Sequence, residues 1–329
     1  MAICETGVPN SLIVCPAQSF MKSGCLQRPP RGRFSLHCIE EIRVSVRRGN
    51  VVEAVHRVHA VAVQDGAVIA EAGDPQLVAF MRSSSKPLQA VPLARARPDM
   101  DARDLAIASA SHLADEAQLA AVCGLLAKAP AAVDELECGA EGDPPSPLNH
   151  NCSGKHAGML ALCRAHDWPS DGYRLPDHPV QRAIHALHAE AAEVEEQEIP
   201  AAVDGCGVLT FALPLERMAH AFARLEQLEG ARRVADGMRA YPELIRGPRA
   251  TDTQLMRALP GWIAKGGAEG LLCAAGHSVG VALKCEDGNG RALGPAAAAF
   301  FAQLDLDLNE LSVLPLENSR KERVGEIRT

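Results

Sequence analysis

The chain has 329 residues, 47% of them hydrophobic and 22% charged, so it is long and apolar enough to form a globular protein with a substantial core. Its formal net charge is −8 and it carries no block of basic residues, which argues against a nucleic-acid partner. No apolar run approaches the roughly 18–20 residues of a membrane-spanning helix, so we expect no membrane partner.

Residues 1–38 differ in composition from the rest of the chain. They contain four cysteines and four prolines and show no apolar periodicity. We expect this stretch to be a disordered extension, or the product of a start codon assigned too far upstream. Residues 39–329 are then expected to form a single domain.

The eleven cysteines follow no regular spacing, and their number is odd. Because we find no secretory signal, free thiols in a reducing compartment are favoured over disulfides. We therefore expect a cytoplasmic protein in which most cysteines are buried as small hydrophobic residues.

From Ile42 onwards the sequence shows the alternation of β-strands. Alternating valines flank the dipeptide Asp65-Gly66, which is typical of two-residue turns, and predict a β-hairpin around it. The stretch Arg82-Ser83-Ser84-Ser85-Lys86-Pro87 then predicts a helix that Ser83 caps and that continues to Leu93, with Pro92 bending or ending it.

Apolar runs and helical patterns alternate through the rest of the chain. Leu105 to Ser111 has the length of a strand, and Cys138 to Asn149 has the glycine and proline content of a loop. Helices are predicted from about Asp115 to Ala129, from Asn151, from Pro179, and over 215–239, 251–258 and 294–304. β-like runs cover 201–209, 269–275 and 277–284, the last two as a hairpin, and a tail covers 314–327. Strands near both ends with helices between them predict an α+β fold, in which one antiparallel or mixed sheet is covered by helices.

The first candidate site is the pair Ser83 and Lys86. On a helix, their i,i+3 spacing places the hydroxyl and the amine on one face. A lysine can take a serine proton once burial or another cation lowers its pKa, and S-x-x-K is used in this way by serine acyl-transfer enzymes. An ordinary capped helix explains the same spacing about equally well.

The scarcity of lysine draws attention to the few that are present. Of 33 basic residues only seven are lysine, and Lys86, Lys155 and Lys265 all lie among small residues. An amine can lose its proton when buried, whereas a guanidinium essentially cannot, so a site that needs a neutral base requires lysine. Codon bias would explain the scarcity but not these positions.

Two further segments are candidates on weaker grounds. Ser111-His112 follows a predicted strand, where only one of two neighbours can face a given pocket; solvation of the strand end is the simpler explanation. Lys265 precedes Gly266-Gly267, which lets the backbone approach a ligand closely, although an ordinary turn with a solvated lysine fits as well.

A cysteine cluster is the candidate metal site. Cys152 and Lys155 share a face at a predicted helix start, and Cys206 lies in a glycine-flanked turn. Two thiolates and a nitrogen donor can hold zinc with one position open, and His156 is a more usual nitrogen ligand than a lysine. Two buried cysteines without metal are the alternative. The absence of a CxxC pair excludes a structural zinc knuckle.

Six motifs in this order, RSSSKP, ASASH, NHNCSGKHAGM, DGCG, DTQLM and AKGGAEG, resemble the rhizobial-type (class 3) L-asparaginases of the asparaginase II family. The resemblance extends over about residues 42–328 and includes the closing ENSRKERVGEIR. It implies a fold similar to that of the serine β-lactamases, a single catalytic domain over 39–329, and a homodimer that hydrolyses L-asparagine to aspartate and ammonia.

The resemblance also implies roles for individual residues. Ser83 is the expected nucleophile with Lys86 as its base, and Ser111 with Lys265 forms a second Ser–Lys pair that relays protons. Zinc, held by three ligands, positions the substrate. The implied zinc ligands are Cys152, Lys155 and Cys206, and the implied substrate-binding residues are Arg82, Asp204 and His156.

Two departures from the family pattern concern substrate fit. The Ser-His motif usually continues with a small residue, Gly and Glu, but here continues Leu113-Ala114-Asp115-Glu116, and the segment between Tyr241 and Lys265 is shortened. Two alternatives stay open: another serine amidase, of β-lactamase, glutaminase or peptide-amidase type, and an inactive zinc-binding homologue. A lactamase would need a wide apolar groove rather than charged groups for the two ends of an amino acid.

Overall fold

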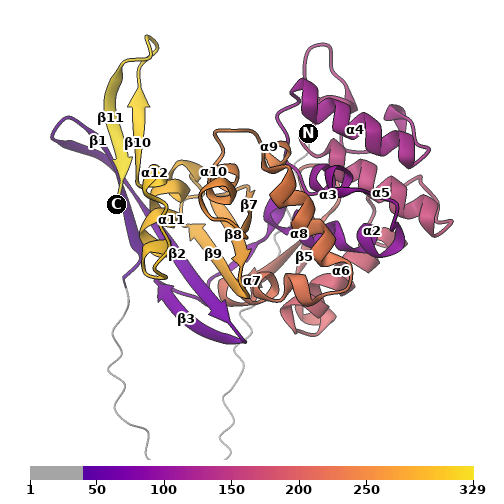
Figure 1. Ribbon diagram of the computed structural model, residues 1–329, viewed down its shortest axis with the longest axis horizontal. Helices are drawn as coiled ribbons and strands as arrows, with labels where there is room; N and C mark the ends of the chain where they lie inside the picture. Colours follow the sequence, from indigo (N-terminus) through magenta and orange to yellow (C-terminus); the bar gives the residue numbers. More distant parts are fainter. Residues whose placement is uncertain (1–39) are drawn as a thin grey trace, which may run out of the picture. The chain divides into compact units, whose positions relative to one another are not determined.

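One large antiparallel sheet organises the fold. The computed structural model describes residues 40–329, so the predicted extension over 1–38 lies outside the described residues. Within them, eight strands follow the order β10-β11-β1-β2-β9-β8-β7, with β3 paired to β2 (Figure 1). They are β1 (Ile42–Arg48), β2 (Val51–Gln64), β3 (Ala67–Ala72), β7 (Ile263–Gly267), β8 (Leu271–Gly276), β9 (Val279–Cys285), β10 (Val313–Glu317) and β11 (Arg323–Arg328). A small second sheet, ordered β4-β6-β5, comprises β4 (Val78–Phe80), β5 (Ala201–Val203) and β6 (Leu209–Pro214).

The helices lie partly on the large sheet and partly beside it. Figure 1 shows α2 to α6 and α8 gathered at the side of the sheet where β7 lies, whereas α11 and α12 lie on the sheet. The helices are α1 (Lys86–Gln89), α2 (Val91–Ala96), α3 (Ala102–Ala108), α4 (Glu116–Lys128), α5 (Ser153–Ala165), α6 (Pro179–Ala192), α7 (Leu215–Ala223), α8 (Ala231–Ala240), α9 (Pro242–Ile245), α10 (Thr251–Ala258), α11 (Leu293–Ala302) and α12 (Asn309–Ser312). Short 3₁₀ turns are η1 (Arg82–Ser85), η2 (Val133–Glu135), η3 (Pro147–Asn149), η4 (Glu196–Glu198), η5 (Leu225–Gln227) and η6 (Gly290–Ala292).

Local signals placed several elements correctly. Asp65 and Gly66 both have positive φ, +50° and +78°, and join β2 to β3 in the tight turn that an Asp-Gly pair favours. Asp115 caps α4 through the N–H of Gln118, and His178 caps α6. The predicted α+β class with an antiparallel sheet is therefore confirmed.

The predicted strand over Leu105 to Ser111 is wrong, because most of this segment is helix α3. The Asp101 side chain accepts the N–H groups of Arg103 and Asp104, and the Asp104 carboxylate accepts the N–H of Asp101, which makes a capping box. Leu105 to Ala108 are all buried, so the run is uniformly apolar, and apolar periodicity cannot separate such a helix from a buried strand.

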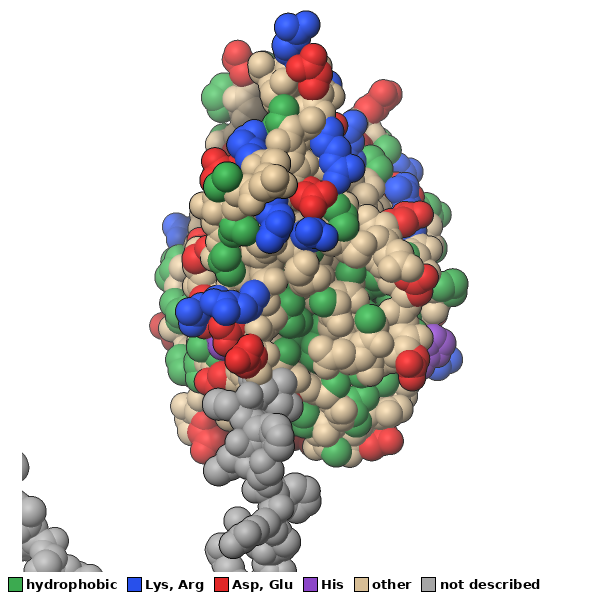
Figure 2. Space-filling model, turned by 90° about the vertical axis from the view of Figure 1, so that its left-hand side faces the viewer, with side chains coloured by type: hydrophobic (Ala, Val, Ile, Leu, Met, Phe, Trp, Pro, Cys, Tyr) green, Lys and Arg blue, Asp and Glu red, His purple; other side chains and the backbone are tan. Residues whose placement is uncertain are grey.

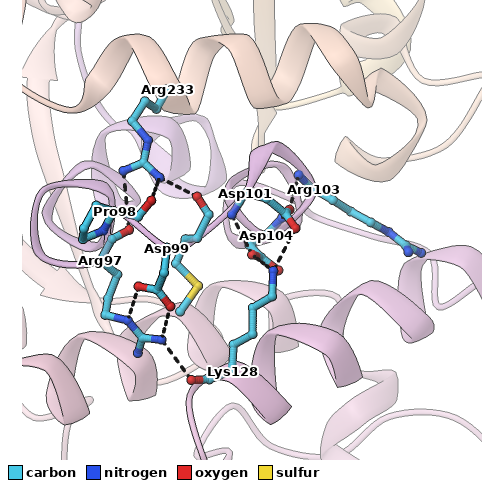
Figure 3. Close-up of polar contacts among 9 residues, drawn as sticks. Arg97, Pro98, Asp99, Asp101, Arg103, Asp104, Lys128 and Arg233 are labelled. Carbon is cyan, nitrogen blue, oxygen red and sulfur yellow. Dashed lines mark hydrogen bonds and ion pairs between the residues drawn. The ribbon is translucent and has the colours of Figure 1, made fainter.

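A polar network holds the start of α3 (Figure 3). Lys128 of α4 donates to the carboxylates of Asp101 and Asp104. Arg233 of α8 donates to the carbonyls of Ala94, Arg97, Pro98 and Met100, in the segment that leads into α3. This network therefore fixes the start of α3 against α4 and α8.

Three other segments differ from the predicted pattern. The helix predicted over 83–93 is divided into η1, α1 and α2, with a break at Ala90, and no side chain caps its start. The helix predicted over 215–239 is interrupted between α7 and α8, where Gly230 has a φ of +76°. The tail predicted over 314–327 is the hairpin of β10 and β11, and β11 pairs with β1.

Strands β8 and β9 of the large sheet pack in the interior of the protein. All six residues of β8 are buried, and α7 packs so closely on β9 that a Cβ at Gly280 would lie 1.9 Å from the Ala219 carbonyl oxygen. The side of the molecule shown in Figure 2 carries charged side chains of both signs among small apolar patches. No helix within residues 40–329 is long and apolar enough to cross a membrane.

Candidate active site

A cavity of about 580 Å³ brings together residues from distant parts of the chain. Its wall includes η1, the residue positions just before α5, the turn between β5 and β6, the first turn of α10, and β7. Six of the predicted site residues line it: Arg82, Ser83, Ser111, Cys152, Asp204 and Cys206.

Ser83 lies in a tightly held turn. The N–H of Arg82 donates to the Thr210 hydroxyl at 3.0 Å, and Arg82 adopts a φ of +48°, which costs a non-glycine residue about 1–2 kcal/mol. The hydroxyls of Ser84 and Ser85 donate to the carbonyls of Met81 and Arg82. Of the three serines only Ser83 lines the cavity.

Strand β7 approaches this turn very closely. A Cβ at Gly267 would lie 2.9 Å from the Met81 carbonyl oxygen and 3.3 Å from the Ser84 nitrogen. Glycine is therefore required at this position for the strand to pack against the turn. The close approach predicted for Gly266-Gly267 thus serves the packing of β7 on η1 as well as the cavity wall.

Lys86 is fully buried and contacts Ser111. Its Nζ donates to the Ser111 hydroxyl at 2.9 Å and to the Ala110 carbonyl. Burial lowers the pKa of the Lys86 amine, against the charge of the Cys152 thiolate. Within the described residues the Ser83 hydroxyl makes no such bond to Lys86, so the Ser–Lys contact joins residues 25 positions apart rather than the S-x-x-K pair.

Lys265 is the second buried amine, and it lies in strand β7 rather than in a turn. Its Nζ donates to the Gly266 carbonyl at 2.6 Å and lies 3.6 Å from Oδ2 of Asp252. Burial lowers the pKa of Lys265 to about 8; Asp252 opposes this shift, and the charges of Lys86 and Arg246 add to it. The two amines therefore influence each other, although Lys265 makes no hydrogen bond to Ser111 within the described residues.

Sequence reasoning assigned no role to Asp252. The residue lies in the first turn of α10 and is only 2% exposed. Its Oδ2 accepts the N–H of Gly266 at 3.0 Å, and its Oδ1 accepts the N–H of Thr253. Asp252 belongs to the DTQLM motif. The feature of the sequence that could have identified it is an aspartate at a helix start, close in the chain to the lysine of AKGGAEG. Four other ionisable residues of the cavity wall were also missed: Glu141, His150, Arg246 and Arg249.

Cys152, Lys155 and Cys206 come together as predicted. Lys155 Nζ donates to Cys206 Sγ at 3.0 Å. A hydrogen bond from the Cys206 thiol lowers the pKa of Cys152 well below its usual value and raises that of Cys206, so the two sulfurs share one proton. Burial lowers the pKa of Lys155, but the two cysteines outweigh it and raise the value overall.

This donor set fits zinc. Two sulfurs and one nitrogen are gathered at one end of the cavity, and both cysteines line it, so a fourth position could face a ligand. The Lys155 amine would have to lose its extra proton on binding, because a nitrogen atom binds a metal ion only in its neutral form.

The remaining predicted residues divide into a pair that lines the cavity and a buried histidine. Arg82 Nε donates to Asp204 Oδ1 at 2.6 Å, and both side chains line the cavity. His156 does not line it: the Tyr173 hydroxyl lies 2.7 Å from its Nδ1 in the core, and burial lowers its pKa well below the usual value. Successive helix residues point about 100° apart, so Lys155 and His156 cannot both face Cys152.

His112 supports the wall without facing the cavity. Its Nε2 lies 2.8 Å from the Ser153 hydroxyl, its Nδ1 accepts the N–H of Ala114, and burial lowers its pKa to about 4. The ring is therefore neutral at physiological pH. Only Ser111 of the Ser-His pair lines the cavity, which agrees with the expectation that one of the two would.

Comparison with known proteins adds one match. The sequence model of the L-asparaginase II family matches residues 44–329. A search of curated proteins finds no significant match.

Proposed function

Because the chain belongs to the L-asparaginase II family, we propose that it hydrolyses the side-chain amide of L-asparagine to L-aspartate and ammonia. The observation that carries the proposal is that Ser83 and Ser111 line one cavity, and that the buried Lys86 amine donates to the Ser111 hydroxyl beside it. A hydroxyl becomes a nucleophile when a neutral base can take its proton, and burial is what favours the neutral form of an amine.

The first half of the reaction forms an acyl-enzyme. Ser83 Oγ attacks the amide carbon while its proton passes to the neutral Lys86 amine. Lys86 then returns that proton to the leaving nitrogen, the carbon–nitrogen bond breaks, and ammonia departs. In the second half, water attacks the ester, gives its proton to Lys86, and the proton returns to Ser83 as aspartate leaves. General base catalysis of this kind contributes about 10²–10⁴-fold.

Ser111 and Lys265 assist these steps. Ser111, which Lys86 already contacts, relays the proton between the amine and the cavity. The Lys265 ammonium repels a proton from Lys86 and stabilises the negative charge that develops on the amide oxygen, an effect often worth a few kcal/mol. The direct Lys86–Ser111 contact also makes Ser111 the rival nucleophile, so the test must identify which serine is acylated.

The charged ends of the substrate are assigned to Arg82 and Asp204. Arg82 uses Nε for Asp204, which leaves its terminal N–H groups for the substrate carboxylate. Asp204 Oδ1 accepts from Arg82 and from the N–H of Gly205, which leaves Oδ2 for the substrate ammonium group. An amidase for larger or apolar substrates would have less use for this pair.

Zinc belongs to the same proposal. Cys152, Lys155 and Cys206 would hold it, and it would supply a fixed positive charge that orients the substrate. The cytoplasmic location and the homodimer are also proposals; the exposed Val51, Val52 and Val55 of β2 offer apolar surface for a second copy. Light scattering of the purified protein would measure the oligomeric state.

Alanine variants test the nucleophile and its base. Ser83→Ala and Lys86→Ala should each lower kcat for asparagine by roughly 10³-fold or more, and the double variant should be no worse than either, because the two residues act as a unit. Ser84→Ala is the matched control, since its hydroxyl donates to the Met81 carbonyl inside the same turn. Ammonia release is measured on asparagine, glutamine and a chromogenic β-lactam in parallel, and mass spectrometry of quenched enzyme locates the acyl group.

The outcomes separate the alternatives. An adduct on Ser111, with activity retained in Ser83→Ala, would transfer the nucleophile role to Ser111. Hydrolysis of the β-lactam but not of asparagine would favour the lactamase alternative. Bound zinc without amide hydrolysis in wild type would identify an inactive homologue.

A further inference from the structure

The amines of Lys86 and Lys265, which are buried beside the cavity, differ in the groups that they contact. Lys265 lies 3.6 Å from the Asp252 carboxylate, and both side chains are almost completely buried. Lys86 has a carbonyl and a hydroxyl as partners, and within residues 40–329 no carboxylate lies within ion-pair distance of it. A carboxylate beside only one of two neighbouring amines gives them different tendencies to hold a proton.

Two backbone hydrogen bonds fix the orientation of the Asp252 carboxylate. Its two oxygens accept the backbone N–H groups of Gly266 and Thr253, so the carboxylate is held between the start of α10 and strand β7. A Cβ at Gly266 would lie 3.3 Å from Oδ2, so the strand and the carboxylate are in direct contact. The side chain therefore cannot turn away from Lys265 without losing these bonds.

We propose that Asp252 is a positioning residue that keeps Lys265 in its ammonium form beside the cavity. This inference deepens the proposed amide hydrolysis and rests on it for its catalytic consequence. Held as an ammonium, Lys265 repels a second proton from the neighbouring amine and stays available to the developing oxyanion. Asp252 acts only through Lys265 and does not contact the reacting atoms.

The charged groups around Lys265 come from four parts of the chain. Asp252 on α10 raises the pKa of Lys265, Lys86 on α1 and Arg246 after α9 lower it, and Cys152 before α5 raises it. Burial is the largest influence and lowers it. Of the two acidic influences, Asp252 is the one in ion-pair contact, so its removal should lower the pKa of Lys265 further.

Asp252→Asn removes the charge and keeps an oxygen that can accept the N–H of Gly266. With Lys265 titrating at a pKa of about 8 in wild type, kcat/KM should fall on the alkaline side as this amine loses its proton. In the variant this alkaline limb should move down by about one pH unit or more, because an opposite charge at this distance shifts a pKa by 1–3 units. At pH 8, kcat/KM for asparagine should then drop about fivefold or more.

Asp104→Asn is the matched control. Asp104 is also a buried aspartate near a helix start, with Lys128 as its cation (Figure 3), but it is not among the residues that line the cavity. This variant should leave the alkaline limb unchanged. A uniform loss of activity over the whole pH range in Asp252→Asn, with the limb unmoved, would show a merely structural role and overturn the proposal.

A second measurement does not depend on catalysis. Between the folded pKa of Lys265, about 8, and its ordinary value, the unfolded chain binds more protons than the folded chain, so stability contributed by this group rises with pH. In Asp252→Asn that rise should begin at lower pH in urea unfolding. If wild type does not hydrolyse asparagine but this shift occurs, the Asp252–Lys265 coupling stands and the proposed function fails. If asparagine is hydrolysed and neither profile moves, the coupling fails.

Discussion

At the scale of single residues, the cavity consists of charged groups that balance one another. Arg82 is paired with Asp204, Lys265 with Asp252, and Lys155 with the two cysteines. Because each buried charge has a partner, the site avoids the large cost of an isolated charge in a low-dielectric environment. Lys86 has no carboxylate partner within the described residues; burial lowers the pKa of its amine, against the charge of the Cys152 thiolate, and so favours the neutral form that a base needs.

Removal of a zinc ligand tests the role of the metal at this scale. Cys152→Ser should lower zinc content after dialysis, since loss of one of three protein ligands weakens metal binding by about 10–100-fold or more. It should raise KM for asparagine while the circular dichroism spectrum stays unchanged. Metal content by plasma mass spectrometry and steady-state kinetics provide the two readouts.

Cys163→Ser controls for the substitution itself. Cys163 is buried in α5, the helix that begins directly after Cys152, and burial raises its pKa to about 11, but it does not line the cavity. Its variant should keep zinc and KM. An unchanged KM in fully metal-free wild type would remove zinc from the proposed function.

At the scale of elements, the contact between strand β7 and turn η1 determines the geometry of the site. One carries Lys265 and the other Ser83, and they belong to segments about 180 residues apart in the sequence. The absence of a side chain at Gly267 allows the two backbones to meet. The spacing of hydroxyl and amine therefore depends on close packing rather than on a local motif.

Gly267→Ala should disturb this contact. The added methyl group would meet the Met81 carbonyl oxygen at 2.9 Å, so the strand or the turn must shift, at a cost of about 1–3 kcal/mol in stability. A displacement near 1 Å can lower kcat by up to about 10²-fold. Gly124→Ala on α4 is the control: nothing lies within 4 Å of its Cβ, so it should stabilise the helix by up to about 1 kcal/mol and leave kcat unchanged. Equal kcat in both variants would contradict the argument.

At the scale of the whole molecule, the first and last described strands, β1 and β11, pair with each other near the end of the strand order opposite β7, which carries Lys265. β11 pairs with β1 and with β10, whereas β7 forms the opposite end of the strand order. Ile327 is buried between these strands and is 4% exposed. We therefore expect Ile327 in β11 to contribute to stability and β7 to contribute to the geometry of the site.

Ile327→Ala should lower the free energy of unfolding without lowering kcat. Loss of a buried isoleucine side chain should cost about 2–5 kcal/mol of unfolding free energy. The kcat of the folded enzyme should stay within about twofold of wild type, since β7 and η1 are untouched. Val313→Ala on β10, where the side chain is 39% exposed, should cost much less. Urea unfolding followed by kinetics at saturating substrate measures both, and a parallel loss of kcat in Ile327→Ala would show that the sheet edges are coupled.

Local features of the fold were predictable because their energetics are local. The Asp65-Gly66 turn and the start of α4 at Asp115 depend on the backbone preferences of neighbouring residues, and both lie in the structure where they were predicted. The segment Leu105 to Ser111 was misassigned because a run that is buried on every side carries no periodicity. Strand β7 was not predicted either, since its short glycine-containing sequence also fits a turn.

The sequence alone identified the family, six of the cavity-lining residues and the three members of the cysteine cluster, because these reside in short motifs whose residue types the chemistry requires. Only the tertiary structure decided that Lys86 contacts Ser111, that His156 turns into the core, and that Asp252 lies beside Lys265. Each of these depends on the direction of a side chain within a packed interior. That direction is determined by the packing of segments far apart in the chain, which spacing along the sequence does not encode.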